Sequence, residues 1–323
     1  MLIPVLLFIV GLVLLIKGGD WFVDGATGLA RRFHIPEIIV GATVVSIGTT
    51  LPEVMVSATG ALNGQGAMAY GNAIGSIICN ASLIAAITLA VRPGPVDVKA
   101  LKMPVIFFFV SAAVYCMAAY LMGEFTRPIG IVLLALFVYY MVVTVRQGFK
   151  SPAPQEEEPH DDGTESPLWK ELLLLVAGAA IIAVGANLLV DNGTIIAQKL
   201  GVPETVIALT FVALGTSLPE LVTAITSLVK GHGSLSLGNV IGANIFNLVL
   251  VSGVSVTLAP FEVPVGNTIC GINSSLVLDI PLMLLVMVLL TVPALTTKKL
   301  HRWQGIALLT IYAAFCAVQF VLA

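Results

Sequence analysis

The chain carries the same sequence pattern twice, at a constant separation of 167 positions, as between Glu53 and Glu220. The stretch GTTLPE at 48–53 returns as GTSLPE at 215–220, and GNAIG at 71–75 returns as GNVIG at 238–242. Repetition with a fixed register indicates duplicated structural units. The chain must therefore fold into two equivalent halves, each with a carboxylate next to a proline.

The composition is that of an integral membrane protein. Of the 323 residues, 58% are hydrophobic and only 10% are charged, against about 25% charged in soluble domains. The net charge of −3 does not indicate a partner, but the lack of a basic patch argues against nucleic acid, because no cluster would neutralise its phosphates. The apolar run 2–16 is not preceded by a basic segment, so we interpret it as part of a membrane span and not as a signal peptide.

Long apolar runs predict an all-α membrane protein with ten transmembrane helices, because a helix needs about 20 apolar residues to cross a bilayer. Their uninterrupted Val, Leu, Ile and Phe content excludes the alternating pattern of a membrane barrel. The predicted spans are 2–29, 36–62, 67–91, 100–122, 127–147, 168–199, 203–229, 235–259, 271–293 and 301–322.

A polar segment divides these spans into two sets of five. Residues 148–167 are rich in Pro, Glu and Asp, which is typical of a solvated linker. Residues 1–147, with the repeated motif at 41–80, form the first half, and residues 168–323, with its copy at 208–247, form the second. Because five is odd, the second half must enter the membrane in the opposite sense, which predicts an inverted-topology repeat.

The basic residues predict the orientation. With both termini outside, twelve Lys and Arg side chains fall on the cytoplasmic side and only Arg127 and Lys199 on the outer side, with Lys17 inside the first span. Positive residues accumulate on the cytoplasmic side of membrane proteins. We therefore expect a multi-pass protein of the inner or plasma membrane with a cytoplasmic linker.

Glu53 and Glu220 fall near the middle of the second and seventh predicted spans. A carboxylate at that depth costs about 2.5–3.5 kcal/mol on insertion scales, so it needs a cation, a proton or water. Pro52 and Pro219 each remove a backbone donor, which frees carbonyl oxygens one turn earlier. The motif therefore predicts an ion site, to which the neighbouring hydroxyls would contribute.

Asn80 and Asn247 follow in the third and eighth spans and add neutral amide oxygens, which suit Ca²⁺ and Na⁺. All these candidate ligands are oxygens, and no His or Cys cluster indicates zinc or copper. Because no pair of nucleophile and base is visible, we do not expect an enzyme. The four cysteines lie in apolar runs and are interpreted as small hydrophobic residues.

The two motifs, with their spacing and the ten predicted spans, resemble the alpha repeats of the sodium/calcium exchanger family in the cation/calcium antiporter superfamily, of the compact prokaryotic type without regulatory domains. The resemblance implies that the two glutamates are shared cation ligands. It also implies that further side chains, and the carbonyls of Ser46 and Ala213, complete the Na⁺ and Ca²⁺ sites. The full set of candidate ligands is Glu53, Glu220, Thr49, Thr50, Ser76, Asn80, Thr216, Ser217, Asn247, Ser46 and Ala213.

Two positions depart from the pattern of this family. Ala243 stands where a serine would match Ser76, and Asn247 stands where an aspartate can occur. Potassium-dependent relatives carry aspartate there, so this chain resembles the potassium-independent kind. Proton/calcium relatives carry a histidine in the repeat elements, and this chain has none in GTTLPE, GTSLPE, GNAIG or GNVIG.

The resemblance implies a secondary antiporter that exchanges Na⁺ for Ca²⁺ by alternating access. Three Na⁺ against one Ca²⁺ would make the exchange electrogenic. The second, third, seventh and eighth spans would form the core, with the first and sixth sliding against it as a gate. We expect no cofactor and no obligatory protein partner besides the transported ions and the lipid bilayer. An H⁺/cation antiporter or a cation channel could use the same oxygens, and both alternatives remain open at this point.

Overall fold

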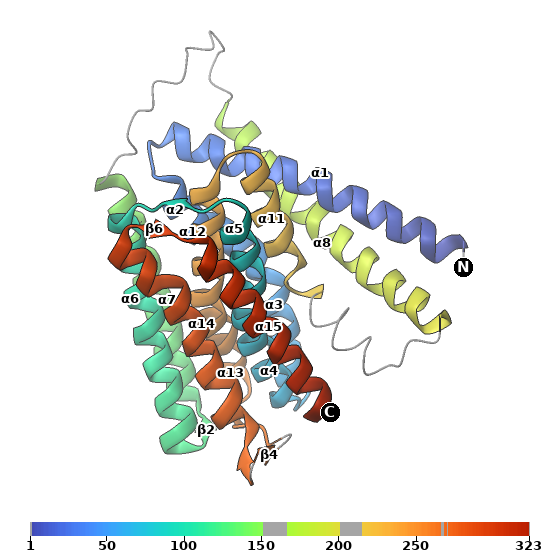
Figure 1. Cartoon of the computed structure of the whole chain (residues 1–323), viewed down its shortest axis with the longest axis vertical. Helices are drawn as coiled ribbons and strands as arrows, with labels where there is room; N and C mark the ends of the chain where they lie inside the picture. The colour runs from blue at the N-terminus through green and yellow to red at the C-terminus, as the bar shows by residue number, and fades with distance from the viewer. Residues whose placement is uncertain (1, 151–166, 201–214, 266–267, 270, 323) are drawn as a thin grey trace.

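The computed structural model describes residues 2–150, 167–200, 215–265, 268–269 and 271–322. Their fold is a bundle of helices, several of which contain π-helical segments, labelled η (Figure 1). The helical elements are α1 (Leu2–Arg32), α2 (Glu37–Val40), η1 (Gly41–Val45), α3 (Ser46–Leu62), α4 (Gly66–Cys79), η2 (Asn80–Ile84), α5 (Ala85–Val91), α6 (Val98–Met117), η3 (Ala118–Met122), α7 (Arg127–Lys150), α8 (Leu168–Lys199), α11 (Leu218–Val229), α12 (Gly233–Phe246), η5 (Asn247–Val251), α13 (Ser252–Leu258), η6 (Ser275–Asp279), α14 (Ile280–Thr297) and α15 (Arg302–Leu322).

Eight continuous helical segments of the described chain are long and apolar enough to cross a membrane, which confirms a multi-pass, all-helical membrane protein. Their bounds are Leu2–Arg32, Glu37–Leu62, Gly66–Val91, Val98–Met122, Arg127–Lys150, Leu168–Ile196, Gly233–Leu258 and Ser275–Thr297. Most lie within three residues of the predicted spans. The first part of the predicted span 203–229 lies outside the described residues, as does most of the linker, and α11 forms the rest of that span. The last predicted span corresponds to α15.

One helix starts later than its apolar pattern predicts. The expected span 271–293 begins instead at Ser275 and continues to Thr297. The preceding residues form a short hairpin in which Gly271 has a φ of +80°, a backbone conformation that favours glycine. The Asn273 side chain then accepts a hydrogen bond of 3.0 Å from the backbone N–H of Ser275. Such local capping supports the helix start, and hydropathy alone does not reveal it.

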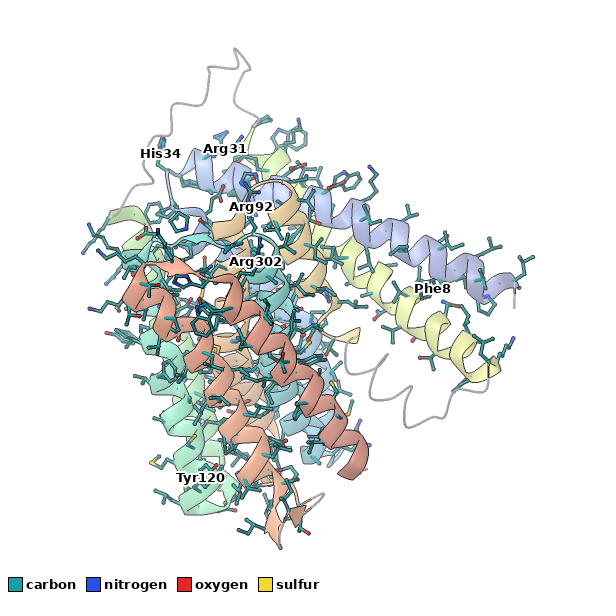
Figure 2. The ribbon with its side chains drawn as sticks, in the orientation of Figure 1. Phe8, Arg31, His34, Arg92, Tyr120 and Arg302 are labelled. Carbon is teal, nitrogen blue, oxygen red and sulfur yellow. The ribbon has the colours of Figure 1, made fainter. Side chains whose placement is uncertain are left out.

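Three antiparallel strand pairs, each two residues per strand, join loops at the ends of the bundle and were not predicted. They are β1 (Gly94–Pro95) with β6 (Lys299–Leu300), β2 (Glu124–Phe125) with β3 (Phe261–Glu262), and β4 (Thr268–Ile269) with β5 (Ile272–Asn273). Figure 2 labels Arg31, Arg92 and Arg302 towards one end of the bundle and Tyr120 at the other. We call the end that carries these three arginines the basic end.

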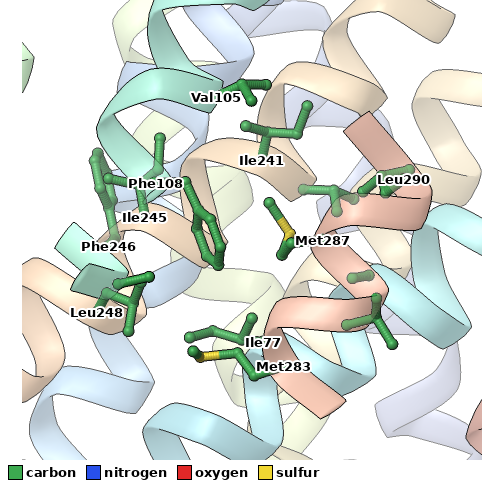
Figure 3. Packing of buried hydrophobic residues seen from close by; sticks show 14 of the residues in the cluster. Ile77, Val105, Phe108, Ile241, Ile245, Phe246, Leu248, Met283, Met287 and Leu290 are labelled. Carbon is green, nitrogen blue, oxygen red and sulfur yellow. The ribbon is translucent and has the colours of Figure 1, made fainter. Parts of the chain in front are cut away.

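The helices that contain the repeated motifs form the centre of the molecule. In Gly233–Leu258, 83% of the apolar window is buried, and in Gly66–Val91 72%, against 22% in Leu2–Arg32. Figure 3 shows one side of α12 packed against α6 and α14, where Phe108 and Met287 surround Ile241 and Ile245. The exposed apolar side chains of the outer helices are then available to contact lipid.

The long helices α1 and α8 lie side by side along one edge of the bundle (Figure 1). A methyl group at Gly11 would lie 2.9 Å from the carbonyl oxygen of Gly185, and one at Gly185 would lie 2.9 Å from the carbonyl oxygen of Gly11. Further along, Gly25 meets the backbone of Glu171. Because the residue numbers rise in one helix as they fall in the other, the two helices are antiparallel. Glycines allow their backbones to approach this closely.

The helix bounds themselves repeat at the interval of 167 positions. α4, η2 and α5 run from Gly66 to Val91, and α12, η5 and α13 run from Gly233 to Leu258, with each internal boundary at the matching residue. Likewise α3 ends at Leu62 and α11 ends at Val229. The sequence repeat is therefore accompanied by a structural repeat in the described elements of the centre.

Candidate cation-binding site

The two candidate ligand asparagines, Asn80 and Asn247, each lie where the helix changes type. Asn80 begins η2 and Asn247 begins η5, each directly after a central α-helix. π-helical segments inside α-helices are frequent at functional sites, because the extra residue redirects side chains and backbone carbonyls. A third such segment, η1, ends immediately before Ser46. Three of the predicted ligand positions thus adjoin irregular helix.

The two prolines affect their helices differently. Pro52 lies inside α3, which continues through it to Leu62. Pro219 lies at the start of α11, directly after the turn residues Thr216 and Ser217. The expectation of a broken helix at both prolines is therefore fulfilled only in the second half, where a new helix begins. Proline is well accommodated at a helix start, since the missing N–H is not needed there.

Glu53 and Glu220 are both completely buried, with no exposed side-chain surface. None of their four carboxyl oxygens has a hydrogen-bond partner among the described residues. The two carboxyl groups are close enough to interact electrostatically. Burying unpaired polar or charged groups costs several kcal/mol, roughly. Two such carboxyl groups in one location therefore form a strong site for a cation or a proton.

The two threonines of the first motif lie at the same place. The Thr49 and Thr50 hydroxyls both lie near the Glu220 carboxyl, and both threonines are buried. Oγ1 of Thr50 makes no hydrogen bond within the described chain. Thus a motif from the first half faces the glutamate of the second.

Asn80 and Asn247 are also fully buried. Neither polar atom of the Asn80 amide has a partner in the part of the chain that is described. In Asn247, Nδ2 donates a hydrogen bond of 3.0 Å to the carbonyl oxygen of Ala243, whereas Oδ1 has no partner among the described residues. The hydrogen bond therefore orients the Asn247 amide, and its Oδ1 can accept a cation. Neutral amide oxygens of this kind suit Ca²⁺ or Na⁺.

Hydroxyl groups connect the helices around these residues. The hydroxyls of Ser217 and Ser76 lie 3.5 Å apart, which links the start of α11 to α4. Oγ of Ser46 donates to the carbonyl oxygen of Gly41 at 2.8 Å. Of the remaining predicted ligands, Thr216 is half-buried, and Ala213 lies outside the described residues.

Asn239, in the GNVIG element, was not among the candidate ligands. Its Oδ1 lies 3.3 Å from the hydroxyls of both Ser46 and Thr49, and its backbone oxygen lies 3.0 Å from Oγ of Ser46. It therefore positions two predicted ligands of the other half. Its counterpart Asn72 instead donates within its own half, to the backbone oxygen of Glu53 at 3.2 Å and to Oγ of Ser57 at 2.7 Å.

Sequence reasoning missed one buried hydroxyl in this region. Thr223 is fully buried and its hydroxyl has no hydrogen-bond partner among the described residues. It follows Glu220 by three positions, so both side chains project from one face of α11. The helical spacing from Glu220 could have indicated Thr223. The repeat could not, because the matching position in the first half is Val56.

The donor set consists of carboxylates, hydroxyls and amides. Across the described residues there is no cluster of three or more His, Cys, Asp or Glu side chains, so the arrangement differs from a zinc or copper centre. Hard cations such as Ca²⁺ take six to eight oxygens, roughly, from mixed carboxylate and neutral groups. The chemistry of the site is thus suited to Ca²⁺ and Na⁺.

Comparison with known proteins identifies the family. The family model described as sodium/calcium exchanger protein matches residues 3–146 and 170–321. The chain belongs to the sodium/calcium exchanger family. The two matched segments exclude most of the acidic linker and contain both copies of the motif.

Relatives in this family span the full length of the chain. The putative antiporter CaxA of Alkalimonas amylolytica is 34% identical, with 100% of this chain and 99% of CaxA covered. The sodium/calcium exchanger MaX1 of Methanosarcina acetivorans is 30% identical, with 98% of both chains covered. A solved structure of the sodium-calcium exchanger NCX_Mj, soaked with Na⁺ and Sr²⁺, superposes with a TM-score of 0.81 at 33% identity, over 98% of this chain and 99% of that one.

Proposed function

We propose that this exchanger family member exchanges Ca²⁺ for Na⁺ across the membrane, through one central site that opens to the two sides of the membrane in turn. The observation that carries the proposal is the pair of fully buried glutamates, Glu53 and Glu220, whose carboxyl oxygens have no hydrogen-bond partner among the described residues. One Ca²⁺ neutralises two carboxylates, which removes the electrostatic cost of burying them together. The names of MaX1 and NCX_Mj support the choice of ions.

The proposed ligands come from both halves of the chain. The carboxylates supply the charge, and the hydroxyl, amide and backbone oxygens complete the coordination shells of Ca²⁺ and Na⁺. This set is Glu53, Glu220, Thr49, Thr50, Ser76, Asn80, Thr216, Ser217, Asn247 and the carbonyls of Ser46 and Ala213. Asn239 would hold Ser46 and Thr49 in place without contacting the ion.

We further propose ten transmembrane helices arranged as two inverted repeats of five, with residues 1–147 and 168–323 as the two halves. Support comes from the matched helix bounds at 66–91 and 233–258. The antiparallel crossing of α1 and α8 also supports it, since Gly11 and Gly18 contact α8 near Gly185 and Gly178, which are their counterparts in reversed order. Reciprocal contacts of this kind are expected from a two-fold axis in the membrane plane.

Alternating access is supported by close packing between the two halves at the basic end. Gly238 packs against the backbone of Ile38, and Gly242 packs against Ala42 and Ser46. The residues that match this packing partner in the second half, 203–213, lie outside the described residues. Movement of α1 and α8 against the core would open and close the two ends in turn.

The orientation follows from the basic residues, so we assign the basic end and the linker to the cytoplasm. Asn247 in place of an acidic residue argues for transport that does not depend on K⁺. Three Na⁺ per Ca²⁺ would make the cycle electrogenic.

Tracer Ca²⁺ uptake into proteoliposomes tests the proposal. Vesicles loaded with Na⁺ should accumulate Ca²⁺ when diluted into Na⁺-free medium, and vesicles loaded with choline should not. Uptake driven by a pH gradient alone would indicate an H⁺/cation antiporter. Flux that does not depend on any counter-ion would indicate a channel. Either result contradicts Na⁺/Ca²⁺ exchange.

A further inference from the structure

The turn between α11 and α12 is tied to the first half of the chain by three polar contacts. Its residues are Lys230, Gly231 and His232, and it lies at the basic end. Lys230 and His232 each contact an acidic residue of the first half. In addition, Arg92 donates a hydrogen bond of 3.2 Å to the carbonyl oxygen of Leu228, in the last turn of α11. We refer to residues 230–232 as the basic turn.

Lys230 connects the basic turn to α1. Its Nζ lies 2.7 Å from Oδ1 of Asp24 and 3.5 Å from Oδ1 of Asp20, and it also donates to the backbone oxygen of Asp20 at 3.1 Å. Lys17 lies 4.0 Å from the other carboxylate oxygen of Asp20. The Lys230 side chain is only 25% exposed, so these pairs are less screened by water than a fully exposed ion pair. These contacts fix the basic turn, which joins α11 and α12, to the long edge helix α1.

His232 connects the same turn to α2. Its Nδ1 lies 2.7 Å from Oε1 of Glu37, the first residue of α2. Immediately behind this contact, α2 and η1 pack tightly on the first turns of α12. A methyl group at Gly41 would lie 2.8 Å from the backbone nitrogen of Asn239. Leu235, whose carbonyl oxygen also faces Gly41, is completely buried. The polar contacts therefore cover a close-packed backbone interface.

The repeat provides an internal comparison for the basic turn. The turn between α3 and α4 has Asn63, Gly64 and Gln65 at the matching positions. Its backbone hydrogen bonds are the same: Gln65 N–H donates to Gly60 O at 2.8 Å, and His232 N–H donates to Ser227 O at 2.7 Å. The glycines have φ values of +75° and +91°. The two turns thus share a backbone and differ in their side chains, because Lys230 and His232 have the neutral counterparts Asn63 and Gln65.

We propose that Lys230 and His232 act as a latch that favours the conformation of the exchanger that is closed at the basic end. This inference rests on the proposed exchange cycle. Movement of α1 relative to the core must break the contact of Lys230 to Asp24, and movement of the start of α2 with α1 must break the contact of His232 to Glu37. Leu235 belongs to the same buried cluster as the α1 side chains Phe22 and Ala26, so this movement exposes it. The corresponding turn at the opposite end has neutral side chains, so closure of that end lacks the equivalent ammonium–carboxylate pairs. The exchanger is therefore biased between its two states by residues that lie outside the ion site.

The size of the bias follows from typical ion-pair strengths. A partly exposed ion pair shifts an equilibrium by roughly twofold to fivefold. The Lys230 pairs and the His232 contact together should favour the closed basic end by about tenfold. Removing them should increase the population that is open at the basic end by the same factor.

A buried reporter thiol measures this population without measuring transport. In a background with Cys79, Cys116, Cys270 and Cys316 replaced by alanine, Leu235→Cys places a thiol in the packed interface. Its rate of reaction with a small maleimide, in purified protein without Na⁺ or Ca²⁺, reports opening of the basic end. A second reporter, Leu133→Cys in the buried part of α7, detects general loosening of the fold.

The double variant K230N/H232Q gives the basic turn the same side chains as its counterpart. We expect it to raise the labelling rate of the thiol at 235 about tenfold and to leave that at 133 unchanged. K230R keeps the cation and should retain the parent rate. K102N removes one positive charge from an exposed position in the first turn of α6 and should also have no effect. D24N should raise the rate, and combining it with K230N should add little, because both remove the same contact.

An unchanged rate at position 235 in K230N/H232Q, or fully additive effects of K230N and D24N, would overturn the latch. An equal rise at both reporters would also overturn it, since it would indicate unfolding. Because the readout does not involve flux, absence of Na⁺-driven Ca²⁺ uptake by the parent protein would refute the proposed function and leave the labelling result interpretable.

Discussion

The hydroxyl of Thr49 lies 3.3 Å from Oδ1 of Asn239, a bond between a residue of the first motif and a residue of the second half. The same oxygen lies 3.3 Å from Oγ of Ser46. Both hydroxyls thus use their proton on Asn239 or on backbone oxygens, which leaves their lone pairs available to a cation. Asn239 in this way decides which side of Thr49 faces the glutamates.

Asn239→Ala should therefore weaken transport although the residue does not contact the ion. The Thr49 hydroxyl would lose its nearest acceptor, at a cost of about 1–3 kcal/mol, whereas Ser46 would keep the backbone oxygens of Gly41 and Asn239. We expect a lower thermal unfolding temperature and a higher Na⁺ concentration for half-maximal exchange. Asn72→Ala is the comparison in the first half, because the described hydrogen bonds of Asn72 stay within that half, to the backbone oxygen of Glu53 and to Oγ of Ser57. Equal shifts in Na⁺ dependence for both variants would argue against a specific role for Asn239.

Gly242 should respond to alanine more strongly than a glycine that faces a flexible side chain. A methyl group at Gly242 would lie 2.6 Å from the Cα of Ala42, whereas the nearest atoms at Gly60 belong to the Met68 side chain, at 3.2 Å and more. Gly242→Ala should lower stability by about 1–3 kcal/mol through overpacking. Gly60→Ala should change it by less than about 1 kcal/mol, because Met68 can move and alanine has the higher helix propensity. Thermal unfolding in detergent distinguishes them, and equal effects would contradict the packing difference.

Cysteine accessibility tests the membrane orientation. Ser234 is exposed next to the basic turn, and Glu124 is exposed in β2 at the opposite end. In a background without native cysteines, a membrane-impermeant thiol reagent applied to intact cells should label Glu124→Cys and should not label Ser234→Cys. Permeabilised cells provide the control, since both positions should then react. The reverse pattern in intact cells would invert the proposed topology.

Charge counting predicts a voltage-dependent exchange. Two carboxylates balance one Ca²⁺, whereas three Na⁺ leave one positive charge to cross the membrane, worth about 2.3 kcal/mol per 100 mV. At equilibrium the Ca²⁺ ratio should change roughly 50-fold per 100 mV. Proteoliposomes clamped with valinomycin at several K⁺ gradients measure this ratio. A voltage-independent Ca²⁺ distribution would instead support two Na⁺ per cycle, for which the missing hydroxyl at Ala243 and the missing charge at Asn247 offer a reason.

The sequence predicted most helices, because each is a long apolar run. The end of α3 at Leu62 and the start of α7 at Arg127 are the predicted residues. It predicted the burial of Glu53 and Glu220 for the same reason. The π-helical segments at Asn80 and Asn247 were not predictable, because hydropathy does not distinguish them from α-helix. The start of η6, which leads into α14, depends on the hydrogen bond from Ser275 to Asn273, and the role of Asn239 depends on contacts across the halves. Such features arise from tertiary packing, to which a single sequence gives little access.

The central claim is that Glu53 and Glu220 form one site at which Na⁺ and Ca²⁺ compete. Its most direct test is equilibrium binding of tracer Ca²⁺ to the purified protein, with and without Na⁺. Glu262→Gln is the matched control, because Glu262 is an exposed glutamate of β3. We predict that the parent and Glu262→Gln bind Ca²⁺ and release it as Na⁺ rises, whereas Glu53→Gln and Glu220→Gln each lose this binding while remaining folded. Retention of Na⁺-sensitive Ca²⁺ binding in either of these two variants would contradict the account.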